Sequence, residues 1–286
     1  MAQLLKGKAV AERITAETVK KTEELKKRGV FPTLAIIRLG ENAGDVYYEK
    51  AAVKRAAEAG IAVKQFVLGA ETSQEALIDR INAINSDTGI HGVLLFRPLP
   101  SHIDDKAVCS ALSFEKDMDG ITPGSMAGVF MDSGEGYPPC TAEACMDILD
   151  YYRVDLTGKK VTVMGRSLVI GKPVAMMAMK RNATVTVCHS RTEERDFAEA
   201  GAGADIVIAA LGRAKMIDST KLGRNQVIID VGINEDEEGK MCGDVNFADA
   251  EPGASMITPV PGGVGSVTTA VLMKHVAEAA EKTVSK

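Results

Sequence analysis

The sequence lacks the features of a membrane protein, a secreted protein and a nucleic-acid-binding protein. None of its apolar runs reaches the ~18 residues that a membrane-spanning helix requires. The N-terminal residues show no apolar segment followed by a small-residue cleavage site, so we expect no secretory signal. Lysine and arginine number 34 against 39 acidic residues, for a net charge of -5, which argues against a phosphate-backbone partner. We therefore expect a cytoplasmic protein that binds neither membrane nor nucleic acid.

Cysteine is scarce and follows no known pattern. The five cysteines stand at positions 109, 140, 145, 188 and 242, without a Cys-x-x-Cys pair or Cys/His ligand spacing. A disulfide framework or a zinc site would need pairings that this spacing does not suggest. We expect reduced thiols that pack as small hydrophobic groups, and no metal site.

The residues that are present predict two α/β domains. The chain has 286 residues, enough for two domains, and 45% of them are hydrophobic, as is usual for globular proteins. Apolar runs alternate with amphipathic stretches over the first half, which indicates a parallel βαβ domain. A second series of apolar runs predicts a Rossmann-like sheet. The runs of the first half are 32–40, 61–69 and 91–100, and those of the second are 159–165, 183–189, 204–212, 226–233 and 255–261.

Long helices are expected to link the two domains. Residues 8–28 have an amphipathic helical pattern, and the Gly/Pro-rich segment 132–141 is a plausible first crossing between domains. We expect a first domain over 1–140 and a second over 141–266. A final helix within 267–286 could return to complete the first domain, leaving a cleft between two lobes for a small ligand.

The segment VTVMGRSLVIGKP (161–173) reads as a strand, a glycine turn and the start of a helix. Its glycines do not form the GxGxxG spacing, so the motif alone is of moderate specificity. Gly165 permits close backbone approach, Arg166 and Ser167 add a charge and a hydroxyl, and helix N-terminal amides attract an anion. The segment is typical of a pyrophosphate-binding turn. The alternative is a tight turn with an exposed arginine.

The next predicted strand ends in CHSRTEER (188–195), where dinucleotide folds read the adenosine ribose. An Asp or Glu at this position would bind the 2′-hydroxyl of NAD. The chain instead has Ser190 and Arg191, with Arg166 nearby, and these side chains can hold a 2′-phosphate. The pattern favours NADP. His189 has no identifiable acid or nucleophile as partner, so we assign it no catalytic role.

Several motifs together carry a family resemblance. They are GRSLVIGKP, CHSRT, DVGIN, GDVNF and PVPGGVGSVTT in the second domain, and GENAGDVYYEK and EKDMDG in the first. In this order they resemble the bifunctional methylenetetrahydrofolate dehydrogenase/cyclohydrolase family, nearly from end to end. The resemblance implies two lobes joined by long helices, with tetrahydrofolate in the cleft against the nicotinamide of NADP. It also implies a homodimer built through the cofactor domain.

The resemblance assigns roles to individual residues. It places the pterin-stacking tyrosine on Tyr48 and the pterin-binding aspartate on Asp119, and both chemistries suit a flat aminopyrimidine ring. The loop that closes near the folate falls on Pro261, Gly262 and Gly263. The cofactor-binding residues that we expect are Gly165, Arg166, Ser167, Ser190, Arg191 and Ile233.

Two positions depart from the family pattern. The family's usual lysine lies four residues beyond the stacking tyrosine, and Ala52 stands there; the glutamine that supports this lysine aligns with Phe96. Lys50 and Lys54 lie about 200° and 240° around a regular helix from Tyr48, so both should point away from it. We expect a solvated lysine pair.

We therefore expect an NADP-dependent 5,10-methylenetetrahydrofolate dehydrogenase with weak or no cyclohydrolase activity. Three alternatives stay open. A local bulge in the helix could bring Lys54 into the site and keep the enzyme bifunctional. The chain could also be a dehydrogenase for another small substrate, or a non-catalytic folate- or nucleotide-binding protein.

Overall fold

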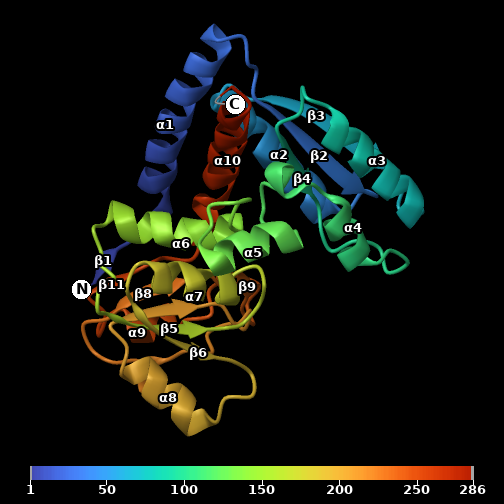
Figure 1. The fold of residues 1–286 in the computed structure, drawn as a ribbon. Coiled ribbons are helices and arrows are strands. Elements are labelled where there is room, and N and C mark those ends of the chain that lie inside the picture. Colours follow the sequence, from blue (N-terminus) through green and yellow to red (C-terminus); the bar gives the residue numbers. More distant parts are fainter. Residues whose placement is uncertain (1, 285–286) are drawn as a thin grey trace. The chain divides into compact units, whose positions relative to one another are not determined.

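The computed structural model describes residues 2–284, and the chain divides into two compact units (Figure 1). The six-stranded unit comprises the residues up to Ala11 and Thr141–Thr268. The three-stranded unit comprises Glu12–Cys140 and the residues from Thr269 onward. Each unit is named after its main sheet, and both sheets are parallel. The predicted α/β fold class is therefore confirmed.

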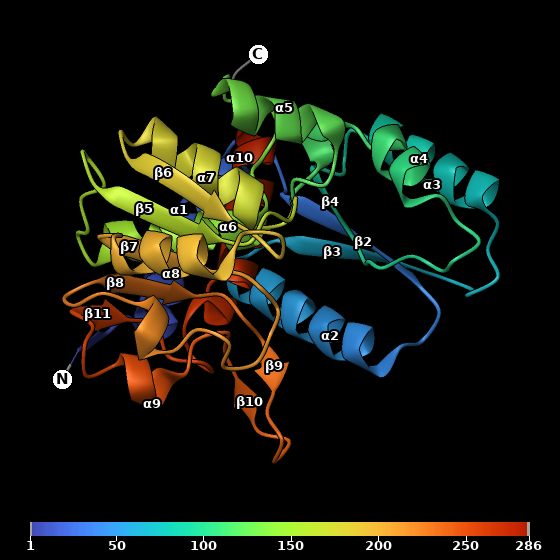
Figure 2. The same cartoon turned by 90° about the horizontal axis from the view of Figure 1, so that it is seen from below.

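The sheet of the three-stranded unit has the order β3-β2-β4. Its strands are β2 (Thr33–Leu39), β3 (Ala62–Leu68) and β4 (Gly92–Leu95). Six of the seven residues of β2 are buried, because neighbouring strands and helices cover this central strand on all sides. Figure 2 shows α2 (Ala43–Glu58) on one face of the sheet and α3 (Gln74–Ser86) on the other.

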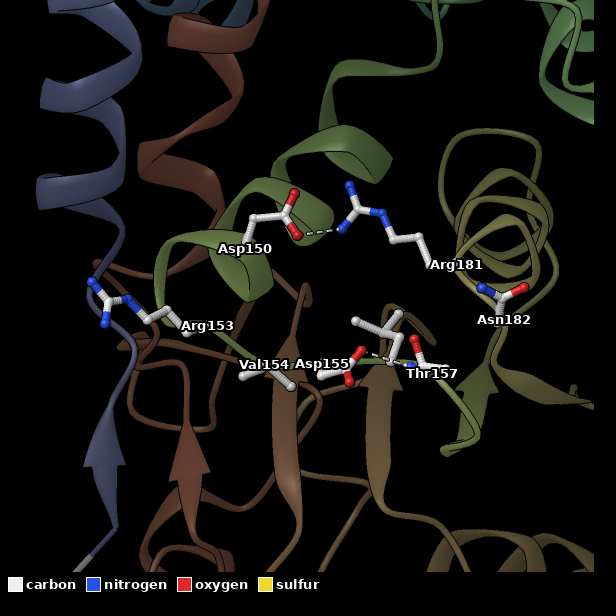
Figure 3. A pocket seen from close by; sticks show the side chains of 8 residues that line it. Asp150, Arg153, Val154, Asp155, Thr157, Arg181 and Asn182 are labelled. Atoms are coloured by element: carbon white, nitrogen blue, oxygen red, sulfur yellow. Dashed lines mark hydrogen bonds and ion pairs between the residues drawn. The ribbon is translucent and has the colours of Figure 1, made fainter.

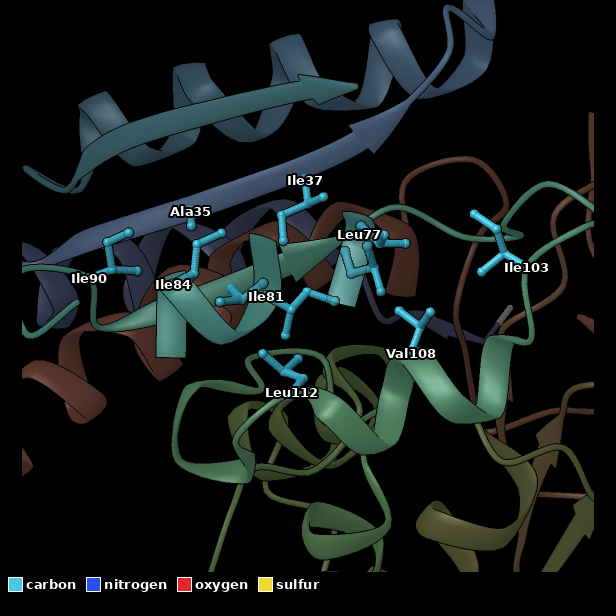
Figure 4. Packing of buried hydrophobic residues seen from close by; sticks show 11 residues of the cluster. Ala35, Ile37, Leu77, Ile81, Ile84, Ile90, Ile103, Val108 and Leu112 are labelled. Carbon is cyan, nitrogen blue, oxygen red and sulfur yellow. The ribbon is translucent and has the colours of Figure 1, made fainter. Parts of the chain in front are cut away.

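One hydrophobic core of this unit lies between its sheet and α3 (Figure 4). Ala35 and Ile37 extend from one face of β2, and Leu77, Ile81 and Ile84 recur at helical spacing on the facing side of α3. The remaining helices of the unit are α1 (Gly7–Lys27, which begins in the other unit), α4 (Asp105–Ala111), η1 (Phe114–Lys116), α5 (Pro123–Met131) and α10 (Thr268–Lys282).

The sheet of the six-stranded unit has the order β1-β11-β8-β7-β5-β6. Its strands are β1 (Gln3–Leu4), β5 (Lys160–Met164), β6 (Thr184–Cys188), β7 (Ile206–Ala209), β8 (Val227–Asp230) and β11 (Met256–Ile257). From β5 the chain runs outward to β6 and then returns past β5 to β7. This reversal creates a topological switch point between β5 and β7, and open parallel sheets bind ligands beyond the carboxyl ends of the strands at such a point.

Short helices and one hairpin complete the six-stranded unit. They are α6 (Cys140–Tyr151), α7 (Gly171–Lys180), α8 (Glu194–Ala202), η2 (Ser219–Lys221), the hairpin β9 (Asn234–Glu235) with β10 (Met241–Cys242), α9 (Phe247–Ala250) and η3 (Val264–Ser266). All five cysteines are buried without a disulfide, as expected. Within residues 2–284, no helix is long and apolar enough to cross a membrane.

The observed division differs from the expected one at the N-terminus. Residues up to Ala11 belong to the six-stranded unit, whereas the sequence placed them in the first domain. The physical reason is strand β1, which pairs in parallel with β11 through Gln3 and Met256 and so adds a sixth strand to the sheet. A two-residue strand is too short to produce a recognisable apolar pattern.

Candidate functional site

A cavity of about 330 Å³ lies where the chain reverses direction in the six-stranded sheet. Its lining comes from the segments that follow the carboxyl ends of β5, β6 and β7. Gly165, Arg166 and Ser167 line it from the first segment, Ser190 from the second and Arg213 from the third. The cavity therefore occupies the switch point at which an open parallel sheet binds its ligand.

Two glycines make the turn after β5 possible. Gly165 has a φ of 139°, and a Cβ atom there would lie 2.2 Å from the carbonyl oxygen of Ala210. A Cβ atom on Gly171, the first residue of α7, would lie 2.2 Å from the carbonyl oxygen of Gly165. The hydroxyl of Ser167 accepts a hydrogen bond of 3.1 Å from the backbone N–H of Ile170. The turn is thus closely packed, and its glycines allow backbone atoms to approach one another.

Of the three residues expected to hold the 2′-phosphate, two line the cavity and one does not. Arg166 and Ser190 line the cavity, whereas Arg191 is exposed and is not among the lining residues. His189 also lines the cavity, and its Nδ1 accepts a 3.1 Å hydrogen bond from the backbone N–H of Arg191. Arg213 also lines the cavity, and the sequence analysis did not single it out. Its place shortly after the predicted strand 204–212 could have indicated it, because ligands bind beyond the carboxyl ends of such strands.

The remaining predicted cofactor and loop residues lie elsewhere in the same unit. Ile233 is 66% exposed, and its Cδ1 atom lies 3.5 Å from where Gly265 would carry a Cβ atom. Pro261 and Gly262 are exposed and Gly263 is buried. The carbonyl oxygen of Gly262 accepts a 2.8 Å hydrogen bond from the N–H of Gly7, so the loop is fixed to the start of α1.

In the three-stranded unit, Tyr48 lies beside Phe96. Tyr48 is on α2 and is 39% exposed, while Phe96 directly follows β4 and is 9% exposed. The two ring centroids are 5.8 Å apart with an interplanar angle of 75°, an edge-to-face arrangement. Tyr48 therefore keeps part of its surface available at the carboxyl end of the sheet, supported on one side by Phe96.

Asp119 lies at the same end of this sheet. The segment before it runs parallel to β4, with Asp117 bridged to Val93, so Asp119 reaches the level where β4 ends. Asp119 is half-buried and accepts a 3.3 Å hydrogen bond from the backbone N–H of Cys140. Burial raises the pKa of the Asp119 carboxyl group, and hydrogen bonds from Cys140 oppose that shift.

A cation that sequence reasoning did not single out stands near Asp119. Arg97 follows Phe96 and makes two hydrogen bonds to Asp105, one of them 2.6 Å from Nε to Oδ1. The pKa of Arg97 is raised mainly by these bonds, and the charge of Asp119 adds to the effect. The carboxyl end of β4 thus brings together an aromatic pair, an acid and a fixed guanidinium.

Neither Lys50 nor Lys54 on α2 is buried against the sheet. The helix is continuous from Ala43 to Glu58, without a π-bulge. Ala52 is fully buried, whereas Lys50 and Lys54 are both exposed. Glu58, four residues after Lys54, pairs instead with Arg55 at 3.2 Å. The structure therefore agrees with the solvated lysine pair expected from the helix angles.

Two further cavities lie at amino ends of strands, where ligands of parallel sheets are not expected. One, of about 540 Å³ in the six-stranded unit, contains the Asp150–Arg181 ion pair at 2.7 Å (Figure 3). The other, of about 790 Å³ before β4, is lined in part by Lys116, whose Nζ donates to the carbonyl oxygens of Ile84 and Asp87. Within residues 2–284, no group of three His, Cys, Asp or Glu side chains is arranged to hold a metal ion.

Comparison with known proteins identifies the family. The family profile described as "Tetrahydrofolate dehydrogenase/cyclohydrolase, catalytic domain" matches residues 5–119, and the profile of its NAD(P)-binding domain matches 139–284. Bifunctional protein FolD of Clostridioides difficile (strain 630) is 46% identical over 277 residues, which are 97% of this chain and 96% of that protein.

Solved structures agree over the whole chain. The bifunctional FolD enzyme of Campylobacter jejuni is 35% identical with a TM-score of 0.96, covering 99% of this chain and 100% of that one. The Trypanosoma brucei FolD enzyme, solved with NADP cofactor and an inhibitor, is 34% identical with a TM-score of 0.93, covering 100% and 99%. The chain therefore belongs to the tetrahydrofolate dehydrogenase/cyclohydrolase family.

Proposed function

We propose that this chain is an NADP-dependent 5,10-methylenetetrahydrofolate dehydrogenase of one-carbon metabolism. The observation that carries the cofactor choice is the cavity at the switch point, lined by a guanidinium and a hydroxyl from Arg166 and Ser190. No acid stands among the four residues directly after β6, where the 2′-hydroxyl of NAD would be bound, and Glu194, which also lines the cavity, belongs to α8. Gly165, Arg166 and Ser167 line the cavity just before α7 begins, so a guanidinium, a hydroxyl and a glycine turn suited to a pyrophosphate are in place and the residues present fit NADP.

NADP supplies the hydride acceptor, and the chain binds and orients the reactants. Tyr48 offers its exposed ring surface for stacking against the pterin. Asp119 accepts paired N–H donors from the aminopyrimidine edge, and such donors favour its ionised form despite partial burial. As hydride leaves the methylene carbon, the adjacent folate nitrogen donates its lone pair and the methenyl product forms. No proton transfer at carbon is needed, so near-attack geometry is the main requirement.

We further propose that the chain has weak or no cyclohydrolase activity. Opening the methenyl ring requires activation of water and movement of protons, which positioned acid–base groups typically accelerate ~10²–10⁴-fold. Ala52 cannot move a proton, and Phe96 packs against Tyr48 where the supporting glutamine would stand. The rival, a bifunctional enzyme that uses Lys54, would need α2 to rearrange, because Lys54 is exposed on a regular helix.

The dehydrogenase proposal is tested by mixing the purified protein with methylenetetrahydrofolate and either NADP⁺ or NAD⁺, and by following reduced nicotinamide absorbance. Tyr48→Ala should raise the KM for the folate ~10-fold or more, as lost aromatic stacking contacts commonly do. Tyr47→Ala is the matched control, because Tyr47 is 78% exposed on the adjacent position of the same helix. Absence of NADPH formation would reject the activity, and equal losses in both variants would reject the role of Tyr48.

We also infer a homodimer built through the six-stranded unit. Strand β6 is an edge strand with β5 as its one neighbour in the sheet. Val187 on β6 is 40% exposed and Met179 on the adjacent helix α7 is 53% exposed, so apolar surface accompanies unpaired backbone groups. Light scattering should give the mass of a dimer, and a Val187→Lys variant should shift the population toward monomer. A wild-type monomer at micromolar concentration would reject the inference.

A further inference from the structure

One buried carboxylate holds a wall of the nucleotide cavity. Asp244 is fully buried, and its two oxygens accept hydrogen bonds from three consecutive backbone N–H groups. These are Leu211 at 2.5 Å, Gly212 at 3.1 Å and Arg213 at 2.8 Å. Leu211 and Arg213 both line the cavity on the β7 side of the switch point. Each of these hydrogen bonds is charge-assisted, and such bonds are roughly twice as strong as neutral ones.

The same carboxylate also holds the segment after β8. Its Oδ1 atom accepts a 3.0 Å hydrogen bond from the side-chain amide of Asn234, the residue after Ile233. The backbone N–H of Asp244 donates to Oδ1 of Asp230 at 3.0 Å, and the N–H of Gly232 donates to the same oxygen at 3.0 Å. Asp244 therefore connects the wall that faces the cavity with the segment that carries Ile233.

We propose that Asp244 is a positioning residue for NADP, which fixes the Leu211–Arg213 wall relative to the loop carrying Ile233. The proposal deepens the proposed function and depends on it. Asp244 does not line the cavity itself and acts through the backbone of residues that do.

The geometry makes this role sensitive to a small chemical change. Asn in place of Asp244 keeps the size of the side chain but turns one acceptor oxygen into an NH₂ donor. In either orientation, the new donor faces two existing donors, which are the N–H groups of Leu211 and Gly212 or those of Arg213 and Asn234. Unpaired buried donors are costly, so we expect the wall to move. A displacement of about 1 Å at a reacting group can reduce a rate ~10²-fold.

The test is calorimetric titration of the full chain with NADP⁺ alone, together with steady-state kinetics. Asp244→Asn should weaken NADP⁺ binding ~10-fold, the loss expected when charge-assisted hydrogen bonds are removed. It should raise the KM for NADP⁺ but not the KM for the folate. With a substrate deuterated at the methylene carbon, the isotope effect on kcat should increase, because misplaced reactants make hydride transfer slower. Loss of folded protein alone would lower kcat and change neither binding constant nor isotope effect.

Asp236→Asn is the matched control. Asp236 accepts two backbone N–H groups in the β9–β10 hairpin and pairs with Lys215, but it does not line the cavity. We expect this variant to lose some stability and to bind NADP⁺ as the wild type does. Should Asp244→Asn fail to fold, Asn234→Ala removes a single hydrogen bond to Asp244 and should weaken NADP⁺ binding ~3-fold.

The outcomes separate this inference from the proposed function. Unchanged NADP⁺ affinity in Asp244→Asn and Asn234→Ala, or an equal loss in Asp236→Asn, would overturn the positioning role even if the enzyme is an active dehydrogenase. Weakened NADP⁺ binding in the Asp244 variant supports the role whether or not wild-type protein oxidises the folate. Wild-type protein that binds no NADP⁺ would overturn both.

Discussion

The buried ion pair of the three-stranded unit offers a sharp test of how α2 is held on its sheet. Arg38 Nε and Glu49 Oε2 are 2.7 Å apart, and both side chains are less than a tenth exposed. Gln65 donates to the other oxygen of Glu49 at 2.8 Å, and Arg38 also donates to the carbonyl oxygen of Gly40. Because Glu49 directly follows Tyr48, this pair fixes the part of α2 that carries the proposed stacking ring.

The expected energies follow from burial. Glu49→Leu leaves a guanidinium buried without its counter-charge, and Arg38→Met leaves a buried carboxylate; either change should cost ~3–5 kcal/mol of unfolding free energy. The double variant removes both charges and replaces them with apolar groups of similar size. It should lie within about 2 kcal/mol of the wild type, since well-packed replacements of buried pairs are often neutral or stabilising. Gln65 is exposed and can then bond to water.

Urea unfolding followed by circular dichroism, with hydrogen exchange of residues 33–58, measures these effects and shows whether they are local. The two single variants should unfold at lower urea and exchange faster in α2 and β2. Arg55→Ala is a suitable control, because its ion pair with Glu58 is partly exposed and should contribute less than about 1 kcal/mol. A double variant as unstable as the sum of the singles would mean that the two charges do not interact, and the ion pair would then not be what holds α2 on the sheet.

Further predictions concern the cofactor unit and its pH dependence. Arg166→Ala should weaken NADP⁺ binding by about tenfold or more and leave NAD⁺ binding nearly unchanged. Arg191→Ala should have the smaller effect, because the Arg191 side chain is exposed and lies outside the cavity lining. Titration of both variants with both cofactors measures these losses, and equal losses for NADP⁺ and NAD⁺ would contradict the prediction. Burial raises the pKa of Asp230 to about 6 from 3.8, so its contribution to stability is present below 3.8 and is lost as the pH rises through about 6. The wild type should therefore lose up to about 3 kcal/mol of unfolding free energy relative to Asp230→Asn between pH 4 and pH 7. Urea midpoints at each pH measure this loss. A difference between the two proteins that stays constant with pH would show that the Asp230 carboxyl group titrates normally.

The sequence predicted the sheets because both faces of most strands are covered. The run 32–40 reads as a buried strand, and β2 is indeed buried at six of its seven residues. Periodicity could not reveal β1, which has two residues and is defined by its partner β11. It also could not reveal the Arg38–Glu49 pair, since an arginine in an apolar run and a glutamate in a charged stretch meet only after α2 packs on β2.

For the candidate site, local geometry was predictable and long-range geometry was not. The angular spacing of Lys50 and Lys54 in a regular helix was enough to predict that both are exposed. Arg213 lines the cavity and Arg191 does not, because of how the segments after β6 and β7 fold over the carboxyl ends of the strands. The sequence does not reveal that folding. Asp244 was part of the motif GDVNF, but its three backbone partners lie more than thirty residues earlier in the chain.

The fate of methenyltetrahydrofolate shows whether the chain oxidises the folate without also opening the methenyl ring. Purified protein, methylenetetrahydrofolate and NADP⁺ are combined in a buffer that slows spontaneous hydrolysis, and the absorbances of NADPH and of the methenyl product are followed together. We expect both to rise in step, and we expect added protein not to speed the decay of the methenyl product. Ala52→Lys with Phe96→Gln should introduce that decay. Rapid decay with the wild type, abolished by Lys54→Ala, would contradict the proposed lack of cyclohydrolase activity, because it would show that Lys54 reaches the site.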